Sequence, residues 1–438
     1  MRLEERQEGG FRTLIAVALG LTALALSTAA QDFETPPVLR AQDLVDEELL
    51  SGPHHVVDEE VANDGRMNHF FLRSDFGDFV AASEPMLAVR VREMYAIAEL
   101  QEISRTKAFA DAMRSAAIQP VKAVGQVATH PVNTVKGLPS GINRKFRGLA
   151  YKGRKATHKV NKEVKQENDE DPGEDETGEE GGASKAAETT DQVTAAAKSA
   201  VGYDSARRDL ARRLQVDPYS TNQVLQQELT RLAQAAFAGG LSFRAVTPPT
   251  TVLDVTGDIT DLVWTLPPSE LERRNNLALT EMGVEKALRL EFFENEAYTP
   301  TLDTAVVKAL GGLAEARNRS LFVEIANQAE TARDARFFVG GVRILAAYDD
   351  RVAPITEIVL AGNEELGSLI VGLTSTGQAI VPGAVDYLIW QEGMGVGTLD
   401  AYEKKTVWLR GRISPRARTE LEARGWEIET LVLEGLGL

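Results

Sequence analysis

The 438-residue sequence contains no cysteine, and no histidine follows His158. The first absence excludes disulfides, thiol catalysis and lipid attachment to a cysteine. The second removes the usual general base from every later residue. Patterns typical of a P-loop, a nucleophile elbow or an H-E-x-x-H zinc site are also missing. These absences favour a non-enzymatic protein without cofactor or metal, although carboxylate chemistry stays open because Asp and Glu are plentiful.

Long apolar runs are scarce, and the one at Leu14–Leu26 has Thr22 as its only polar residue. Arginines precede it, and the small residues Ala29 and Ala30 follow it. This pattern predicts a signal peptide over residues 1–30, cleaved near Ala30. As a helix the run would reach about 20 Å, short of the ~30 Å hydrocarbon core, so an uncleaved anchor is the weaker alternative. We therefore expect an exported protein in the periplasm or cell envelope, or secreted, that is soluble or peripheral to the membrane.

Residues 105–165 carry fourteen Lys and Arg against two carboxylates, a local net charge of +12 in a chain of −17. Apolar residues recur there every eleven positions, which is almost three helical turns and places them on one helix face. The first column of the repeat reads Phe109, Pro120, Pro131 and Ile142, and the fifth reads Met113, Val124, Val135 and Phe146. Because proline breaks a helix interior, we expect two or three short amphipathic helices.

An apolar stripe flanked by cations is typical of helices that lie on an anionic membrane surface. The partner predicted here is an anionic lipid surface or another polyanion. The predicted contacts are Lys122, Lys136, Arg144, Lys145, Arg147, Lys152, Arg154 and Lys155. The same periodicity fits helices that pack on the protein's own core, and the sequence does not decide between the two. Nucleic acid is the least favoured partner, because aromatic stacking residues are few in this segment.

Residues 166–188 follow as an acidic stretch, with nine carboxylates and no base between positions 167 and 180. Such a composition predicts a disordered linker. We hypothesise that its charges compete for the basic segment.

Residues 31–104 predict an N-terminal region with an acidic leader, a short helix near Leu44–Leu50 and a β-hairpin that turns near Gly77. Ser83 is the expected cap of a following helix. His54, His55 and His69 lie among acidic residues, but their spacing matches no metal-ligand motif, so we predict no metal site there.

Residues 189–352 predict a helical bundle whose last helix runs from Asn318 to Tyr348, with Phe337 on its buried side. Residues 353–438 predict a small α/β domain, because β-branched runs surround a helix that Ser414 caps. The glycine-rich Gly393–Gly397 could cradle a phosphate, but the motif is partial and a plain loop is favoured. The fold class is therefore α+β and mostly α-helical: an N-terminal β-hairpin plus helices, a central helical bundle and the small α/β domain.

Three segments resemble an uncharacterised family of exported bacterial hypothetical proteins. They are HPVNTVKGLPSG from His130, SAVGYDSARRDLARRLQVDPYSTN from Ser199 and SPRARTELEARGW from Ser414. The resemblance spans most of the expected mature chain and implies a bacterial, exported protein, with no activity or binding residue attached to it.

The predicted function is that of an envelope protein without enzymatic activity, which docks on an anionic surface through residues 105–165 and can also bind a protein partner. The alternative is a carboxylate-dependent hydrolase whose site lies in the C-terminal helical and α/β domains. A deep pocket with paired carboxylates would favour the hydrolase, and a flat helical bundle would favour the binding protein.

Overall fold

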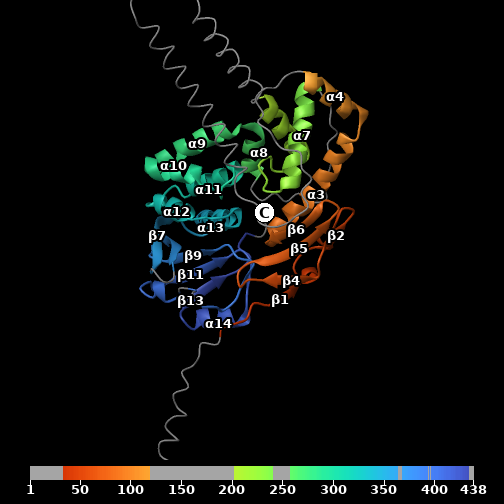
Figure 1. Ribbon diagram of the computed structural model, residues 1–438. Helices are drawn as coiled ribbons and strands as arrows, with labels where there is room; N and C mark the ends of the chain where they lie inside the picture. Colours follow the sequence, from red (N-terminus) through yellow and green to blue (C-terminus); the bar gives the residue numbers. More distant parts are fainter. Residues whose placement is uncertain are drawn as a thin grey trace, which may run out of the picture.

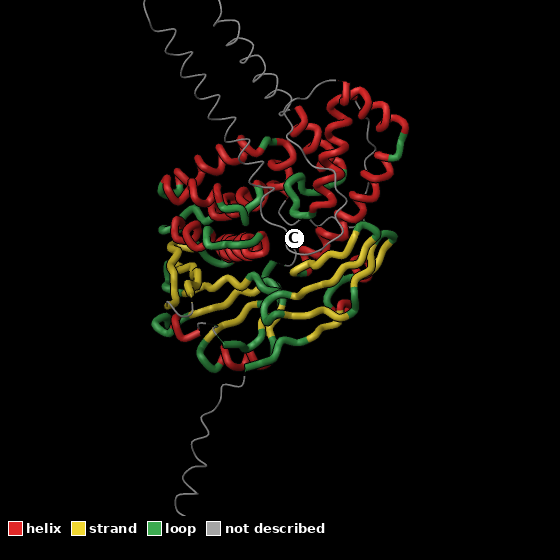
Figure 2. Tube along the Cα trace, viewed as in Figure 1, coloured by secondary structure: helices red, strands yellow, loops and turns green. Residues whose placement is uncertain are grey.

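The computed structural model describes residues 33–118, 202–239, 257–363, 367–392, 394 and 396–433. The fold is a mixed α+β fold in which two sheets lie beside one another and most helices gather on one side of both (Figures 1 and 2). The predicted signal peptide, the acidic linker and the basic segment beyond residue 118 lie outside the described residues. None of the described helices is long and apolar enough to cross a membrane.

The N-terminal sheet consists of six short antiparallel strands in the order β1-β4-β5-β3-β2, with β6 also paired to β5. The strands are β1 (Val38–Arg40), β2 (Ser51–Gly52), β3 (His55–Val57), β4 (Glu60–Asn63), β5 (Asn68–Ser74) and β6 (Gly77–Ala82). The predicted hairpin is confirmed, because β5 and β6 pair from His69 opposite Ala82 to Ser74 opposite Gly77. Gly77 adopts φ +111°, which suits the turn residue with no side chain.

The acidic leader predicted at the start of residues 31–104 is wrong in part, because β1 and β2 belong to this sheet. Strands of two or three residues are too short to show an alternating pattern, so no periodicity marks them as strands. The short helix near Leu50 is present as α2 (Glu47–Leu50), after a 3-10 turn at Ala41–Asp43.

A first core lies between this sheet and four helices: α3 (Glu84–Ser104), α4 (Lys107–Ile118), the helix at 202–213 and α7 (Gln223–Gly239). The Ser83 hydroxyl accepts a hydrogen bond from the Met86 amide, so the predicted cap of α3 is confirmed. The first eleven-residue repeat begins on α4, where Phe109 and Ala112 are buried in this core. At its described start, the repeat therefore packs on the protein itself.

A second core lies under the helices that follow residue 257. They are α8 (Gly257–Thr265), α9 (Pro268–Glu281), α10 (Lys286–Glu294), α11 (Pro300–Gly312), α12 (Arg319–Ala326) and α13 (Ala332–Arg351). The single helix predicted from Asn318 to Tyr348 is wrong, because α12 ends at Ala326 and α13 starts anew. Thr331 and Asp334 form a capping box that fixes this start.

The C-terminal sheet has the order β13-β11-β9-β8-β7 and carries the predicted strands. They are β7 (Ile355–Asn363), β8 (Gly367–Thr374), β9 (Ala379–Gly383), β11 (Lys405–Leu409) and β13 (Trp426–Glu429). Helix α14 (Pro415–Glu422) joins the parallel strands β11 and β13, so the predicted strand–helix–strand unit is present. Ser414 caps α14 by accepting the Ala417 amide. A small parallel pair, β10 (Tyr387–Leu388) and β12 (Arg412–Ile413), lies beside the sheet.

The two sheets are joined where the β4–β5 turn meets β10. The amides of Asp386 and Tyr387 both donate to the Arg66 carbonyl, at 2.8 and 3.1 Å. The Asn68 amide donates back to the Asp386 carboxylate at 3.0 Å. Gly65 has φ +91° here, and a Cβ at this position would lie 2.3 Å from Gln391. This contact sets the first strands of the chain against its last ones.

Candidate functional site

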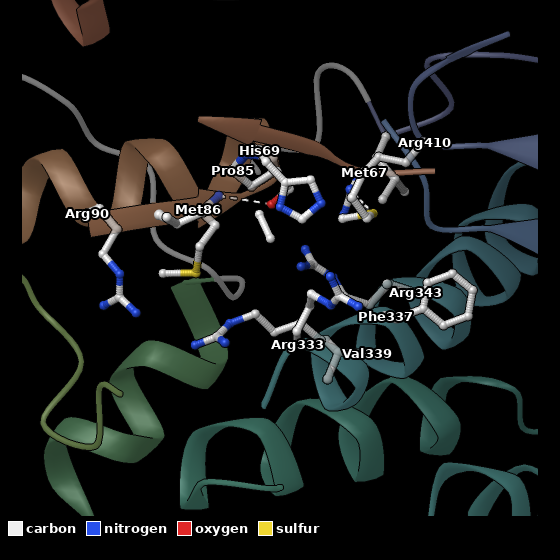
Figure 3. A pocket seen from close by; sticks show the side chains of 16 residues that line it. Met67, His69, Pro85, Met86, Arg90, Arg333, Phe337, Val339, Arg343 and Arg410 are labelled. Carbon is white, nitrogen blue, oxygen red and sulfur yellow. Dashed lines mark hydrogen bonds between the residues drawn. The ribbon is translucent and has the colours of Figure 1, made fainter. Parts of the chain in front are cut away.

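A cavity of about 330 Å³ lies at this junction, between β5, β6, the start of α3 and one face of α13 (Figure 3). Arg410, which follows β11, and Leu433 complete its wall. The volume falls at the lower end of the range of roughly 300 to 1,000 Å³ typical of small-molecule sites.

The wall is strongly cationic, although the whole chain carries −17. Five arginines and one histidine line the cavity, and none of the residues that line it is an Asp or Glu: Arg90, Arg333, Arg336, Arg343, Arg410 and His69. Three of these arginines come from α13, at spacings of three and seven residues that place them on one helix face. Figure 3 shows arginine side chains that reach into the space from three different elements.

Two of the arginines converge on one oxygen atom. The Thr221 hydroxyl accepts hydrogen bonds from Arg90 Nη2 at 2.9 Å and from Arg336 Nη2 at 3.5 Å. Arg90 also donates to Glu93 at 2.5 Å, and that carboxylate is 1% exposed. The guanidinium of Arg336 is held in addition by the Ala332 carbonyl. α3 and α13 thus present their guanidinium groups in a fixed arrangement.

Arg410 is fixed in the same way from the opposite sheet. Its Nη2 lies 2.5 Å from the Asp386 carboxylate, whose side chain is 2% exposed. Burial raises the pKa of Asp386, although the charge of Arg410 and the amide of Asn68 act in the opposite direction. The neighbouring Glu84 is the first residue of α3, and burial followed by the charge of Asp386 raises its pKa to about 7. Both carboxyl groups lie behind the wall.

His69 and Arg333 share a third carboxylate. Asp64 Oδ2 lies 2.9 Å from His69 Nε2 and 3.6 Å from Arg333 Nη1. Burial acts to raise the pKa of Asp64, but the amides of Met67 and Arg66 and the ring of His69 outweigh it, and the net shift is downward. An ionised Asp64 therefore contacts both of these wall residues.

The start of α3 adds a strained residue to the wall. Ser83 adopts φ +134° and ψ 158°, a region that residues with a side chain rarely enter, and such conformations cost of order 1–3 kcal/mol. They are often retained at functional sites. The first turns of α3 and α13 both line the cavity, so the positive ends of two helix dipoles add to the charge of the arginines.

The rest of the wall is apolar. Val80 and Phe337 contribute large exposed surfaces, at 57% and 37%, and Met86, Val339 and Leu433 contribute buried ones. The prediction that Phe337 faces the core is wrong. Along α13, Phe337 lies four residues after Arg333, and it therefore shares the arginine face rather than the buried one.

The cavity suits an anion better than a metal ion. Arginine is always protonated, and its planar fork matches carboxylate and phosphate oxygens. Among the described residues, no three His, Asp or Glu side chains are grouped so that they could hold a metal ion. The histidines considered from sequence are separated: His54 contacts Asp75, His55 is buried, and His69 contacts Asp64.

Other sequence predictions meet this site only in part. The eight basic residues predicted to bind a polyanion, Lys122 to Lys155, lie outside the described residues, as do Gly393 and Gly395 of the glycine-rich loop. The arginines of the cavity were not predicted as a site, because they are far apart in the sequence, at positions 90, 333–343 and 410, and only the fold brings them together. The one local signal was the set of arginines on a single face of α13.

The chain was compared with protein-family models, with characterised proteins and with solved structures, and none of them matches it.

Proposed function

We propose that the protein is a non-enzymatic binding protein that holds a small anionic ligand in the arginine-lined cavity. The observation that carries this proposal is the wall itself, with five arginines and no carboxylate among its residues in a chain of net charge −17. Hydrogen bonds to charged groups contribute about 1.5–3 kcal/mol each, and partial burial strengthens them.

The positions of the partner carboxylates support the same conclusion. Glu93, Asp64 and Asp386 contact Arg90, Arg333 and Arg410 from behind, so they orient the guanidinium groups without lining the cavity. A guanidinium has five N–H donors, more than one carboxylate contact uses. Such an arrangement is preorganised, and preorganisation lowers the entropy cost of binding.

The test is a thermal unfolding series with inorganic phosphate and sulfate, at constant ionic strength set with chloride. A ligand at one hundred times its Kd stabilises the folded state by about 2.7 kcal/mol, so Tm should rise with either dianion. Arg336→Gln should weaken the rise. Arg273→Gln is the matched control, because Arg273 is exposed on α9 and contacts Glu270, away from the cavity. A rise in Tm that both variants keep in full would contradict the proposal.

The hydrolase alternative needs a nucleophile or an activated water in the cavity. Ser83 and His69 both line the wall, and Asp64 lies behind His69. The described contacts of these residues include no Ser83–His69 hydrogen bond, and the Ser83 hydroxyl accepts the Met86 amide instead. Hydrolysis of nitrophenyl phosphate or nitrophenyl acetate that Ser83→Ala abolishes would replace the binding proposal with this one.

The proposal retains the predicted division into an N-terminal region, a helical domain and a small α/β domain. It also retains an exported envelope protein whose residues 105–165 dock on an anionic lipid surface or another polyanion, with a protein partner as a further possibility. The charge of +12 in that segment supports the docking. A deletion variant that tests this docking should lack residues 119–165 and keep α4, because α4 belongs to the first core.

Liposome flotation tests the docking. Binding to anionic vesicles should be salt-sensitive, absent with neutral vesicles and lost in the deletion variant. Equal flotation of both forms would contradict it.

A further inference from the structure

The cavity lining combines two kinds of side chain. Five arginines line it together with the apolar side chains of Met86, Val80, Phe337 and Leu433. A free inorganic ion would contact only the arginines. An exposed apolar surface inside a cavity is unusual in a protein whose remaining large apolar side chains are mostly buried, and it indicates a ligand with an apolar part.

Exposed apolar surface continues from the cavity wall over the sheet. Val80 on β6 pairs with Phe71 on β5, and both are exposed on the same face, at 57% and 36%. Phe337 lines the same cavity from α13. Arg73 borders this strip, with its guanidinium carbon 5.8 Å from the centre of the Phe71 ring, so a ligand body that leaves the cavity along Val80 and Phe71 passes beside one cation.

The arginines come from three elements, and this arrangement favours a tetrahedral head group over a planar one. Arg90 extends from α3, Arg336 from α13 and Arg410 from the end of β11. One carboxylate can occupy one or two guanidinium forks. A phosphate monoester offers three strong acceptor oxygens and a charge of about −1.5 to −2, which suits donors from several directions.

Resting on the proposed function, we propose that the ligand is an amphiphilic phosphate monoester. Its phosphate lies among the arginines, and its hydrocarbon body lies against Met86, Val80 and Phe337. Either a free alkyl phosphate or the head of a phosphorylated lipid has this chemistry.

Isothermal titration of the protein with methyl, butyl, hexyl and octyl phosphate, below their micellar concentrations, tests the proposal. Each buried methylene should tighten Kd by about four-fold. Phe337→Ser changes an exposed side chain, so it should fold; it should weaken octyl phosphate and leave methyl phosphate unchanged. Arg336→Gln should weaken every member, by roughly ten- to hundred-fold. Arg273→Gln should weaken none.

The possible failures are distinguishable. Binding of methyl and octyl phosphate with equal Kd overturns the amphiphilic ligand and leaves the anion site standing. The absence of binding by every phosphate, inorganic phosphate included, overturns the proposed function itself. Octyl phosphate binding that Arg336→Gln leaves intact, or octyl glucoside binding of equal strength, shows a purely apolar contact and overturns both. Vesicles that contain phosphatidic acid distinguish the two sources in the variant that lacks residues 119–165, where the other proposed vesicle contact is absent. Retention of this variant that Phe337→Ser reduces identifies a lipid, and no retention beside tight binding of octyl phosphate identifies a free alkyl phosphate.

Discussion

Glu84 provides a direct test of the buried charge cluster behind the cavity. It is half-buried at the start of α3, and burial together with the charge of Asp386 raises its pKa from 4.5 to about 7. In the folded state Glu84 therefore holds its proton at pH values where the unfolded chain has lost it. Folding stability is then lost as pH rises from about 4.5 to 7.

The size of the effect follows from the shift. A difference of one pKa unit corresponds to about 1.36 kcal/mol, which would make the full penalty about 3 kcal/mol above pH 7. A negative charge at a helix N-terminus gains about 0.3–1 kcal/mol, which reduces this penalty. Glu84→Gln removes the titration and can keep the contact with the Asn68 side-chain amide. We expect the variant to exceed the natural protein by about 2–3 kcal/mol at pH 8, and by much less at pH 4.5.

The assay is urea unfolding at half-unit pH steps, with the difference in unfolding free energy plotted against pH. Asp386 is present in both the natural protein and the variant, so its own titration affects the stability of both. Glu102→Gln is the control, because Glu102 is exposed in the last turn of the same helix and reports the general effect of removing one negative charge. A difference between Glu84→Gln and the natural protein that stays constant with pH would refute the reasoning.

Two further predictions concern residues of the cavity wall. Ser83→Gly should stabilise the protein by about 1 kcal/mol, because glycine relieves the strained φ of +134° and loses only a few tenths of a kcal/mol as a helix cap. Ser83→Ala keeps the strain and loses the cap, so it should destabilise the protein by about 1 kcal/mol. Equal unfolding midpoints for the two variants would contradict this. Arg410→Met should cost about 3–5 kcal/mol in denaturant unfolding, because it leaves the carboxylate of Asp386 buried without its cation. In the Asp386→Asn background the same change should cost much less, and equal costs in both backgrounds would show that the ion pair is not the cause.

The sequence predicted elements well where local signals are strong. Ser83 and Ser414 cap the helices that they were expected to start. The β-branched runs after residue 353 form strands, because a run of this kind between glycines has few other structures available. The prediction of one continuous helix from Asn318 to Tyr348 was wrong for a reason that the sequence itself contains. The apolar spacing continues across the Thr331 and Asp334 capping box and so predicts one helix, whereas the capping box starts a new one.

Local sequence patterns could not predict the candidate site. Its cations are brought together by packing of the β4–β5 turn against β10, a contact between residues more than three hundred positions apart. The charge counted along the chain instead marks residues 105–165 as the candidate anion-binding segment, because the cations there are close together in sequence. Arg90 lies near Glu84 and Glu93, so no local excess of charge marks it. Arg410 lies in a basic stretch from Lys404 to Arg418, but nothing in that stretch indicates that it meets Arg90 and α13.

The most direct test of the central claim is a crystal structure of the protein grown or soaked with phosphate in place of chloride. We expect a phosphate ion inside the cavity, within hydrogen-bond distance of the guanidinium groups of Arg90 and Arg336, which already converge on the Thr221 hydroxyl. A cavity that holds only water at saturating phosphate, or a phosphate bound elsewhere on the molecule, would contradict the account.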